Sequence, residues 1–174
     1  MTFDEYINDL KNRSVAVIGI GVSNLPLIET LLTRGCRVTA CDRRSMAEMG
    51  TDGEKLAAMG AELHLGENYL ENLNFDVIFR TPGLMPFEKH LAEAKERGSV
   101  ITSEMEAFFE VCPCPILAVT GSDGKTTTTT IVSELLKKAG RTVHGIFRST
   151  AMIINSEKPL CFTYIPNGIS LSPR

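Results

Sequence analysis

The stretch Ser14–Asn24, which reads SVAVIGIGVSN, decides the fold of this chain. Its first part, Ser14–Ile20, is an apolar, β-branched run that leads into glycine, which is typical of a buried parallel strand. The turn Gly19–Asn24 follows, and apolar residues then recur at helical spacing over Asn24–Arg34 until Gly35 ends the pattern. A strand, a glycine turn and a helix in this order predict the opening unit of a parallel sheet.

The same alternation of strands and helices continues along the chain. Further strands are predicted at Arg37–Cys41, Glu62–Leu65, Phe75–Phe79 and Val100–Thr102, and helices at Thr2–Lys11, Glu54–Met59, Pro86–Arg97 and Glu104–Glu110. The first of these helices opens on a capping box, because Glu5 follows Thr2 by three residues. The pattern predicts an α/β fold with a Rossmann-like parallel sheet and helices on both faces.

Composition and charge narrow the classes of partner. The chain has 174 residues with 18 Lys and Arg against 21 Asp and Glu, a net charge of −3, and it has no basic run, so we expect no nucleic-acid partner. Its longest apolar stretch, Val15–Val22, is far shorter than the roughly 20 residues of a membrane span, so we expect no membrane partner and a cytoplasmic location. The cysteines form no C-x-x-C pair and the histidines are scattered, which disfavours a Cys/His metal site.

The first glycine turn, Gly19–Asn24, reads G-x-G-x-x-N and lacks the third glycine of the dinucleotide fingerprint. Its N–H groups and the start of the next helix can meet an anion. Asp42 ends the second strand 18 residues after Asn24, where NAD-binding proteins place an acid against a ribose hydroxyl. Three interpretations remain open: a nucleotide-binding or UDP-sugar-binding turn, an NAD-dependent oxidoreductase, and a turn that serves only the strand-to-helix geometry.

A second glycine turn follows the proline-broken connector Cys112–Pro115, where we place a domain boundary. Pro115–Thr120 predicts a strand, and Gly121–Thr127, GSDGKTT, opens a helix. That helix carries Ile131, Val132, Leu135 and Leu136 on one side, and a strand is predicted after it at Arg141–His144. The order is typical of a P-loop unit that wraps N–H groups around a phosphate chain.

Lys125 and Thr126 are the residues of this second turn whose side chains could bind phosphate and a metal ion. Lys125 would reach the terminal phosphates of a nucleotide, and the Thr126 hydroxyl would be a ligand of Mg²⁺. The alternative is that Lys125 is a solvated charge at the start of a helix. A cation at the positive end of a helix dipole is unfavourable without an anion to offset it.

The segments GIGVSN (19–24), CDRR (41–44), RTPG (80–83), TSEMEAFF (102–109) and AVTGSDGKTTTTT (118–130) together resemble the N-terminal portion of the Mur ligases. Within that family the resemblance is greatest to the D-glutamate-adding branch, and it covers roughly Thr2–His144. It implies a Rossmann-like domain for the UDP end of the substrate at residues 1–112, the truncated start of a P-loop α/β ATP-binding domain at 113–144, and an unassigned tail at 145–174.

The resemblance also implies site residues. Contacts to the UDP-linked substrate are implied for Gly21, Val22, Ser23, Asn24, Asp42, Arg44, Thr81, Pro82 and Gly83. Contacts to ATP are implied for Gly121, Ser122, Asp123, Gly124, Lys125, Thr126 and Thr127, with Lys125 and Thr126 catalytic and Thr126 a ligand of Mg²⁺. Most relatives have Asn in place of Asp123, and we expect this carboxylate to turn outward or to cap the loop internally, because it would repel phosphates.

The reaction implied by the resemblance is an ATP-dependent step of peptidoglycan precursor synthesis. The carboxylate of UDP-N-acetylmuramoyl-L-alanine attacks the γ-phosphate of ATP, and the amine of D-glutamate displaces the phosphate of the resulting acyl phosphate. A lysine and Mg²⁺ beside the transferred group would stabilise the charge that accumulates there.

The resemblance stops near His144. Residues 145–174 contain one acid and three prolines and show no clear helical or strand period. We therefore expect a truncated or out-of-frame product that lacks ligase activity by itself. A partial second domain would expose an apolar patch and an open sheet edge, which predicts poor solubility.

Overall fold

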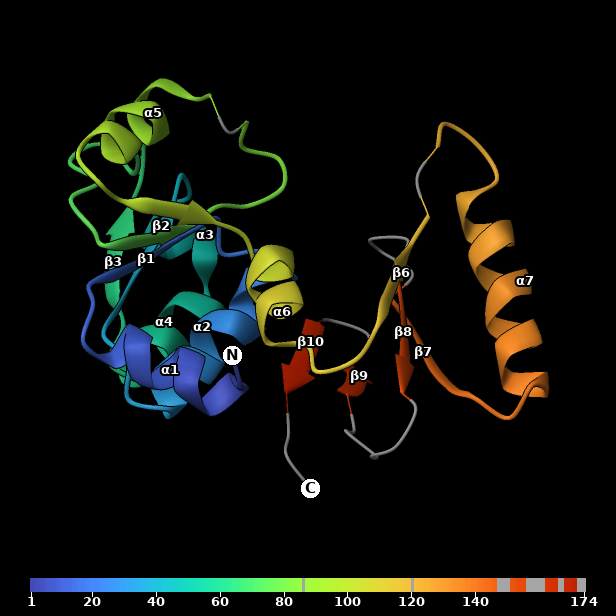
Figure 1. Cartoon of the computed structure of the whole chain (residues 1–174). Coiled ribbons are helices and arrows are strands. Elements are labelled where there is room, and N and C mark those ends of the chain that lie inside the picture. Colours follow the sequence, from blue (N-terminus) through green and yellow to red (C-terminus); the bar gives the residue numbers. More distant parts are fainter. Residues whose placement is uncertain (86, 120, 147–150, 156–161, 166–167, 172–174) are drawn as a thin grey trace. The chain divides into compact units, whose positions relative to one another are not determined.

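The computed structural model describes residues 1–85, 87–119, 121–146, 151–155, 162–165 and 168–171 (Figure 1). Residues Met1–Val111 make up the main part of one unit of the chain, and most of a second unit lies in the residues from Cys112 onward.

The first unit is built on a five-stranded parallel sheet with the strand order β3-β2-β1-β4-β5. The strands are β1 (Val15–Ile18), β2 (Val38–Asp42), β3 (Glu62–Leu65), β4 (Val77–Phe79) and β5 (Val100–Thr102). Because β1 pairs with both β2 and β4, the strand order reverses beside β1. The carboxyl ends of β1 and β4 therefore border the topological switch point, where open α/β sheets bind ligands.

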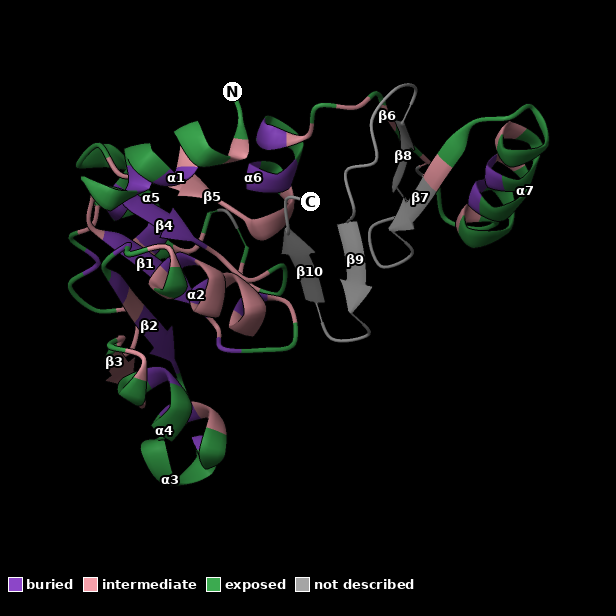
Figure 2. Cartoon of the chain, turned by 90° about the horizontal axis from the view of Figure 1, so that it is seen from below, coloured by how far each residue is buried: buried purple, intermediate pink, exposed green. Residues whose placement is uncertain are grey.

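Helices cover both faces of this sheet (Figure 1). They are α1 (Phe3–Lys11), α2 (Asn24–Thr33), α3 (Met46–Met49), α4 (Thr51–Ala58), α5 (Lys89–Glu96) and α6 (Glu104–Val111). Successive residues of a strand point to opposite faces, so Val15 and Val17 join one buried cluster while Ala16 and Ile18 join the other. Figure 2 shows these central strands as the buried part of the unit. The predicted Rossmann-like fold is confirmed.

The element boundaries agree with the sequence pattern in most places and differ where local geometry intervenes. The predicted capping box is present, with the Glu5 N–H donating to Thr2 Oγ1 at 3.2 Å and the Thr2 N–H donating to Glu5 Oε2 at 2.8 Å. β1 stops at Ile18, two residues before the predicted end, because Gly19 has a φ of 84° and turns the chain. The helix α5 starts at Lys89 rather than at residue 86, which lies outside the described residues.

The second unit contains β6 (Ile116–Ala118), α7 (Lys125–Lys138), β7 (Thr142–Ile146) and β8 (Ala151–Asn155). β8 lies between β6 and β7 and is antiparallel to both. The strands β9 (Phe162–Ile165) and β10 (Gly168–Leu171) form a separate two-stranded sheet. The sequence pattern of residues 145–174 predicted none of the last three strands.

The four apolar residues of α7 differ in exposure: Val132 and Leu136 are half-buried on the same stripe as Thr129 and Ser133, and Ile131 and Leu135 are not. Thr129 and Ser133 are buried, whereas Ile131 and Leu135 are 55% and 61% exposed. Residues two apart on a helix point in nearly opposite directions, so burial of Thr129 and Ser133 turns Ile131 and Leu135 outward.

Candidate nucleotide-binding site

Three of the predicted site segments follow the carboxyl ends of adjacent strands in the first unit. The turn Gly19–Asn24 follows β1, the segment Asp42–Arg44 begins at the last residue of β2, and Thr81–Gly83 lies just after β4. Since β1 is paired in parallel with β2 and with β4, the three segments meet at one edge of the sheet. The residues predicted to contact a UDP-linked substrate are thus collected beside the switch point.

Asp42 is buried at this edge and stabilises it through hydrogen bonds. Only 6% of the residue is exposed, and its Oδ2 accepts the Ile20 N–H at 2.7 Å. Its Oδ1 accepts the Arg44 N–H and Nε–H, each at 3.0 Å, and Arg44 Nη2 donates to Oδ2 at 3.0 Å. Burial raises the pKa of Asp42, but the hydrogen bonds from Arg44 and Ile20 outweigh burial and hold the pKa below its ordinary value.

These four donors match the roughly four acceptor positions of a carboxylate. Asp42 is therefore ionised and fully engaged by the protein, with no acceptor position left for a ribose hydroxyl. Arg44 is similarly committed, because it also donates to the carbonyl oxygen of Ile20. In this structure the pair holds the glycine turn in place.

The glycine turn lies directly against the Thr81–Gly83 segment. A Cβ atom added to Gly19 would lie 3.0 Å from Thr81 Cβ, and the φ of Gly19 is 84°, so two independent reasons favour glycine here. Within the described residues, the N–H groups of Gly21, Val22 and Ser23 donate to no acceptor. Gly21 and Val22 are exposed, and Ser23 is half-buried. The turn therefore offers three consecutive amides without an acceptor, and Pro82 and Gly83 of the adjoining segment are exposed.

The side chain of Asn24 is buried inside the protein and is not exposed at the site. It is 2% exposed, and its Nδ2 donates to the carbonyl oxygens of Ile18 at 2.9 Å and Gly19 at 3.0 Å. Its side chain faces the protein.

The second glycine turn, Gly121–Thr127, leads into α7 as the sequence predicts. Gly121 and Gly124 have φ angles of 151° and 73°, and no side chain caps the helix. Lys125 Nζ donates to the carbonyl oxygens of Gly121 at 2.6 Å and Ser122 at 2.9 Å. The ammonium group thus lies over the loop at the positive end of the helix, where carbonyl dipoles offset its charge.

The remaining residues of this loop are open to solvent. Ser122, Asp123, Thr126 and Thr127 are exposed, and no hydrogen bond or ion pair of the Asp123 carboxylate is found within the described residues. The Thr126 hydroxyl also has no hydrogen-bond partner there, so it is free to bind a cation. In the part of the chain that the structure describes, no group of three His, Cys, Asp or Glu side chains could hold a metal ion. Mg²⁺ at Thr126 would therefore need phosphate oxygens as further ligands, which suits its chemistry.

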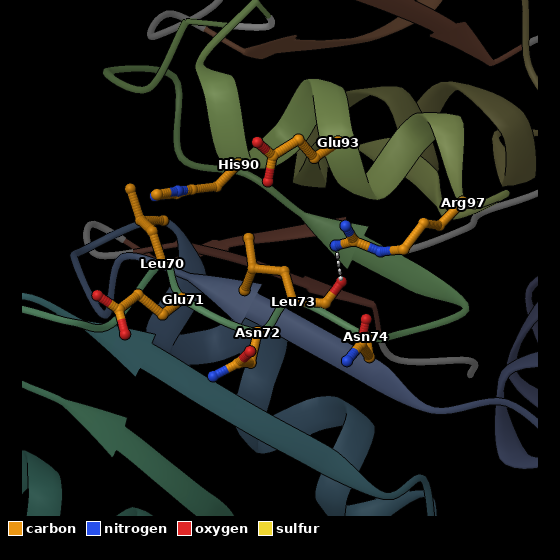
Figure 3. Close-up of a pocket in the computed structure, with 8 residues that line it drawn as sticks. All are labelled: Leu70, Glu71, Asn72, Leu73, Asn74, His90, Glu93 and Arg97. Atoms are coloured by element: carbon orange, nitrogen blue, oxygen red, sulfur yellow. Dashed lines mark hydrogen bonds between the residues drawn. The ribbon is translucent and has the colours of Figure 1, made fainter.

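A pocket that no sequence motif indicates lies between α5 and the segment Leu70–Asn74 (Figure 3). Its volume is about 270 Å³, and its lining residues are Leu70, Glu71, Asn72, Leu73, Asn74, His90, Glu93 and Arg97. Arg97 donates to the Leu73 carbonyl oxygen at 3.3 Å, and His90 Nδ1 is buried without a hydrogen-bond partner among the described residues. None of the predicted site residues lines it, and its own residues share no spacing that a sequence pattern could reveal.

No helix in the described residues is long and apolar enough to cross a lipid bilayer.

Comparison with known proteins relates the chain to one family of ligases. Residues 13–103 match the family described as Mur ligase MurD-like, N-terminal domain. The UDP-N-acetylmuramoylalanine–D-glutamate ligase of Clostridium novyi (strain NT) is 49% identical over 140 residues, which are 80% of this chain and 31% of that protein. The enzyme of the same name from Clostridium botulinum (strain Hall) is 46% identical over 158 residues, 90% of this chain and 34% of that protein.

Among solved structures, a murein peptide ligase from Psychrobacter arcticus is 22% identical with a TM-score of 0.48, covering 74% of this chain and 27% of that one. The chain spans about a third of the length of the curated relatives described above. The family match covers more than half of the chain, including the sheet and the first glycine turn. The chain belongs to the Mur ligase family, and residues 13–103 are its MurD-like N-terminal domain.

Proposed function

We propose that this chain carries the part of a D-glutamate-adding Mur ligase that binds the UDP end of UDP-N-acetylmuramoyl-L-alanine. In this proposal residues 1–112 are the UDP-substrate domain, and residues 113–144 are the start of the ATP-binding domain. The names of relatives that are 46–49% identical support the choice of substrate. Because the chain spans about a third of those relatives, the complete ligation is proposed for the longer enzyme that they represent.

The observation that carries the proposal is the row of free amides at Gly21, Val22 and Ser23, beside the switch point of the sheet. A diphosphate needs several N–H donors and no nearby uncompensated carboxylate, and the start of a helix adds a favourable dipole. The carboxylate nearest to the turn, Asp42, is neutralised by Arg44. Thr81–Gly83 would line the same site from the end of β4.

Calorimetric titration with UDP and with UDP-N-acetylmuramoyl-L-alanine tests this site. Val22 is 48% exposed, so replacing it should leave folding stability nearly unchanged. We expect Val22→Asp to weaken binding by about tenfold or more, because it places a carboxylate beside a diphosphate. The neutral variant Val22→Asn, of nearly the same shape as Val22→Asp, should bind within about threefold of the wild type. Equal affinities of the two variants would contradict a diphosphate at this turn.

The second turn would serve the phosphoryl-transfer half of the reaction. Lys125 and the first amides of α7 would bind ATP phosphates, and Thr126 would share Mg²⁺ with them. The substrate carboxylate would attack the γ-phosphorus with loss of ADP, and the D-glutamate amine would then displace phosphate from the acyl phosphate. The role of Lys125 is to stabilise charge on the transferred group, for which its ammonium must leave the carbonyl oxygens of Gly121 and Ser122.

Titration of the chain with Mg²⁺ and tripolyphosphate, followed by phosphorus NMR, tests this second turn. Lys125→Met should weaken binding by about tenfold, since it removes the cation but keeps the aliphatic stem. Lys138→Met, at the other end of the same helix, is the matched control and should have no effect. Equal loss in both variants would show only a general charge effect.

An NAD-dependent oxidoreductase is the other function class that the first turn suggests. NAD recognition would use Asp42 to accept a ribose hydroxyl, but protein donors occupy that carboxylate. A titration in which NAD binds and UDP does not would favour this class over the proposed one.

A further inference from the structure

The side chain of Asn24 stands where the dinucleotide-binding turn has its third glycine. In that turn, glycine allows the helix to pack closely against the strand. Here Asn24 is the first residue of α2 and is 2% exposed, so an amide is buried at the junction of helix and strand. Burying an amide is unfavourable unless its polar atoms find partners.

The donor half of this amide connects the start of α2 to the end of β1. Nδ2 donates to the carbonyl oxygens of Ile18 and Gly19, at 2.9 and 3.0 Å. The second of these bonds joins the last residue of the turn to its first and so closes the turn into a ring. The acceptor half, Oδ1, is buried and has no partner among the described residues. The two donated bonds are therefore what the side chain contributes.

Contacts from the neighbouring strand β2 fix the first two residues of the same turn. The Gly19 N–H donates to the Cys41 carbonyl oxygen at 2.7 Å, and the Ile20 N–H donates to Asp42 Oδ2 at 2.7 Å. With Asn24 fixing the other end, both ends of the turn are held from inside. The segment 21–23 between them is exposed or half-buried, and its amides have no acceptor among the described residues.

We propose that Asn24 is a positioning residue of the nucleotide-binding turn. It ties α2 to β1 so that the amides of Gly21, Val22 and Ser23 point toward one diphosphate, and it does not touch the ligand itself. This inference rests on the proposed function, since it explains how the same site is held in shape. It also replaces the direct substrate contact that the family resemblance implies for Asn24.

Substitution of Asn24 in the full 174-residue chain tests the proposal with UDP as the probe. Asn24→Leu keeps the number and branching of the side-chain heavy atoms and removes both donated hydrogen bonds. We expect it to weaken UDP binding by about tenfold or more. The control is Ile28→Val, a fully buried residue of the same helix, which lowers stability without removing any hydrogen bond of the turn and should bind UDP within about twofold of the wild type.

Amide hydrogen exchange provides a readout that needs no ligand. In Asn24→Leu the amides of Gly19 and Ile20 should exchange about tenfold faster relative to that of Val17 in β1, because the turn is no longer closed. Ile28→Val should leave this ratio unchanged. If Asn24→Leu does not fold, Asn24→Ser, with a smaller side chain and one hydroxyl donor, should show the same changes to a smaller extent.

The outcomes separate the inference from the proposed function. Normal UDP affinity in a folded Asn24 variant, or an unchanged exchange ratio, overturns the positioning role. If the wild type binds no UDP while the exchange ratio changes as expected, the proposed function fails and the role of Asn24 in shaping the turn stands.

Discussion

Removing the Asp42 carboxylate should destabilise the first unit far more than removing an exposed aspartate. In Asp42→Ala the Ile20 N–H loses its acceptor, and Ile20 is 2% exposed, so water cannot easily replace it. A buried donor left without a partner costs about 1–3 kcal/mol. The Arg44 side chain is 40% exposed, so solvent can satisfy its donors. Loss of the Asp42–Arg44 ion pair therefore adds at most about 1 kcal/mol. We expect Asp42→Ala to lower the free energy of unfolding by about 1–4 kcal/mol.

Urea unfolding followed by circular dichroism measures this change, with Asp4→Ala as the matched control. Asp4 also pairs with an arginine, Arg34, at 3.1 Å, but its side chain is 73% exposed. Its removal should change the free energy of unfolding by no more than about 0.5 kcal/mol. If Asp42→Ala and Asp4→Ala had the same effect, the inference that Asp42 braces the glycine turn from inside would be refuted.

Three further predictions concern the surroundings of the same turn. Gly19→Ala should destabilise the chain more than Gly66→Ala in urea unfolding, because both glycines have positive φ but only the former would place a Cβ against another residue. Because the pKa of Asp42 lies below its ordinary value, the stability advantage of the wild type over Asp42→Asn should be complete above about pH 4 and should shrink as the pH falls below that, which a pH series of the same unfolding curves measures. Burial raises the pKa of Cys41 to about 12, so iodoacetamide at pH 8 should label half-buried Cys114 well before Cys41 by peptide mass spectrometry, and equal labelling would contradict that burial.

The architecture of the first unit could be predicted from sequence because the residues with high strand propensity are also the apolar residues that the fold buries. The run Ser14–Ile20 is both β-branched and apolar, so the strand and its burial follow from the same residues. Glycine marks the turn and the end of the next helix. The short helix α3 was missed although it has a capping box, Ser45 with Glu48, since its four residues are too few to show a hydrophobic period.

The second unit was harder to predict because pairing between distant strands determines it. β8 is held between β6 and β7, and nothing in its own five residues indicates which strands they pair with. Which apolar residues of α7 are exposed also depends on the strands it packs against, since Ile131 and Leu135 are exposed while Val132 and Leu136 are half-buried.

The sequence pattern indicates which segments form the site but not how their side chains are oriented. Asp42 and Asn24 were expected to meet a ligand, yet hydrogen bonds to Ile20 and Gly19 turn both toward the protein. A linear pattern shows which residues reach an edge of the sheet, whereas their orientation depends on partners brought there by the fold. The pocket beside α5 was not predicted either, because the fold brings its lining residues together from separate segments.

Binding of the UDP-linked substrate at the carboxyl edge of the sheet is tested by mapping backbone amide shifts in proton–nitrogen NMR spectra of the chain titrated with UDP-N-acetylmuramoyl-L-alanine. We expect the largest shifts in three segments, 21–24, 42–44 and 81–83, which meet at the carboxyl edge of the sheet. Shifts confined to the pocket between α5 and Leu70–Asn74, or a spectrum that does not change, would contradict it.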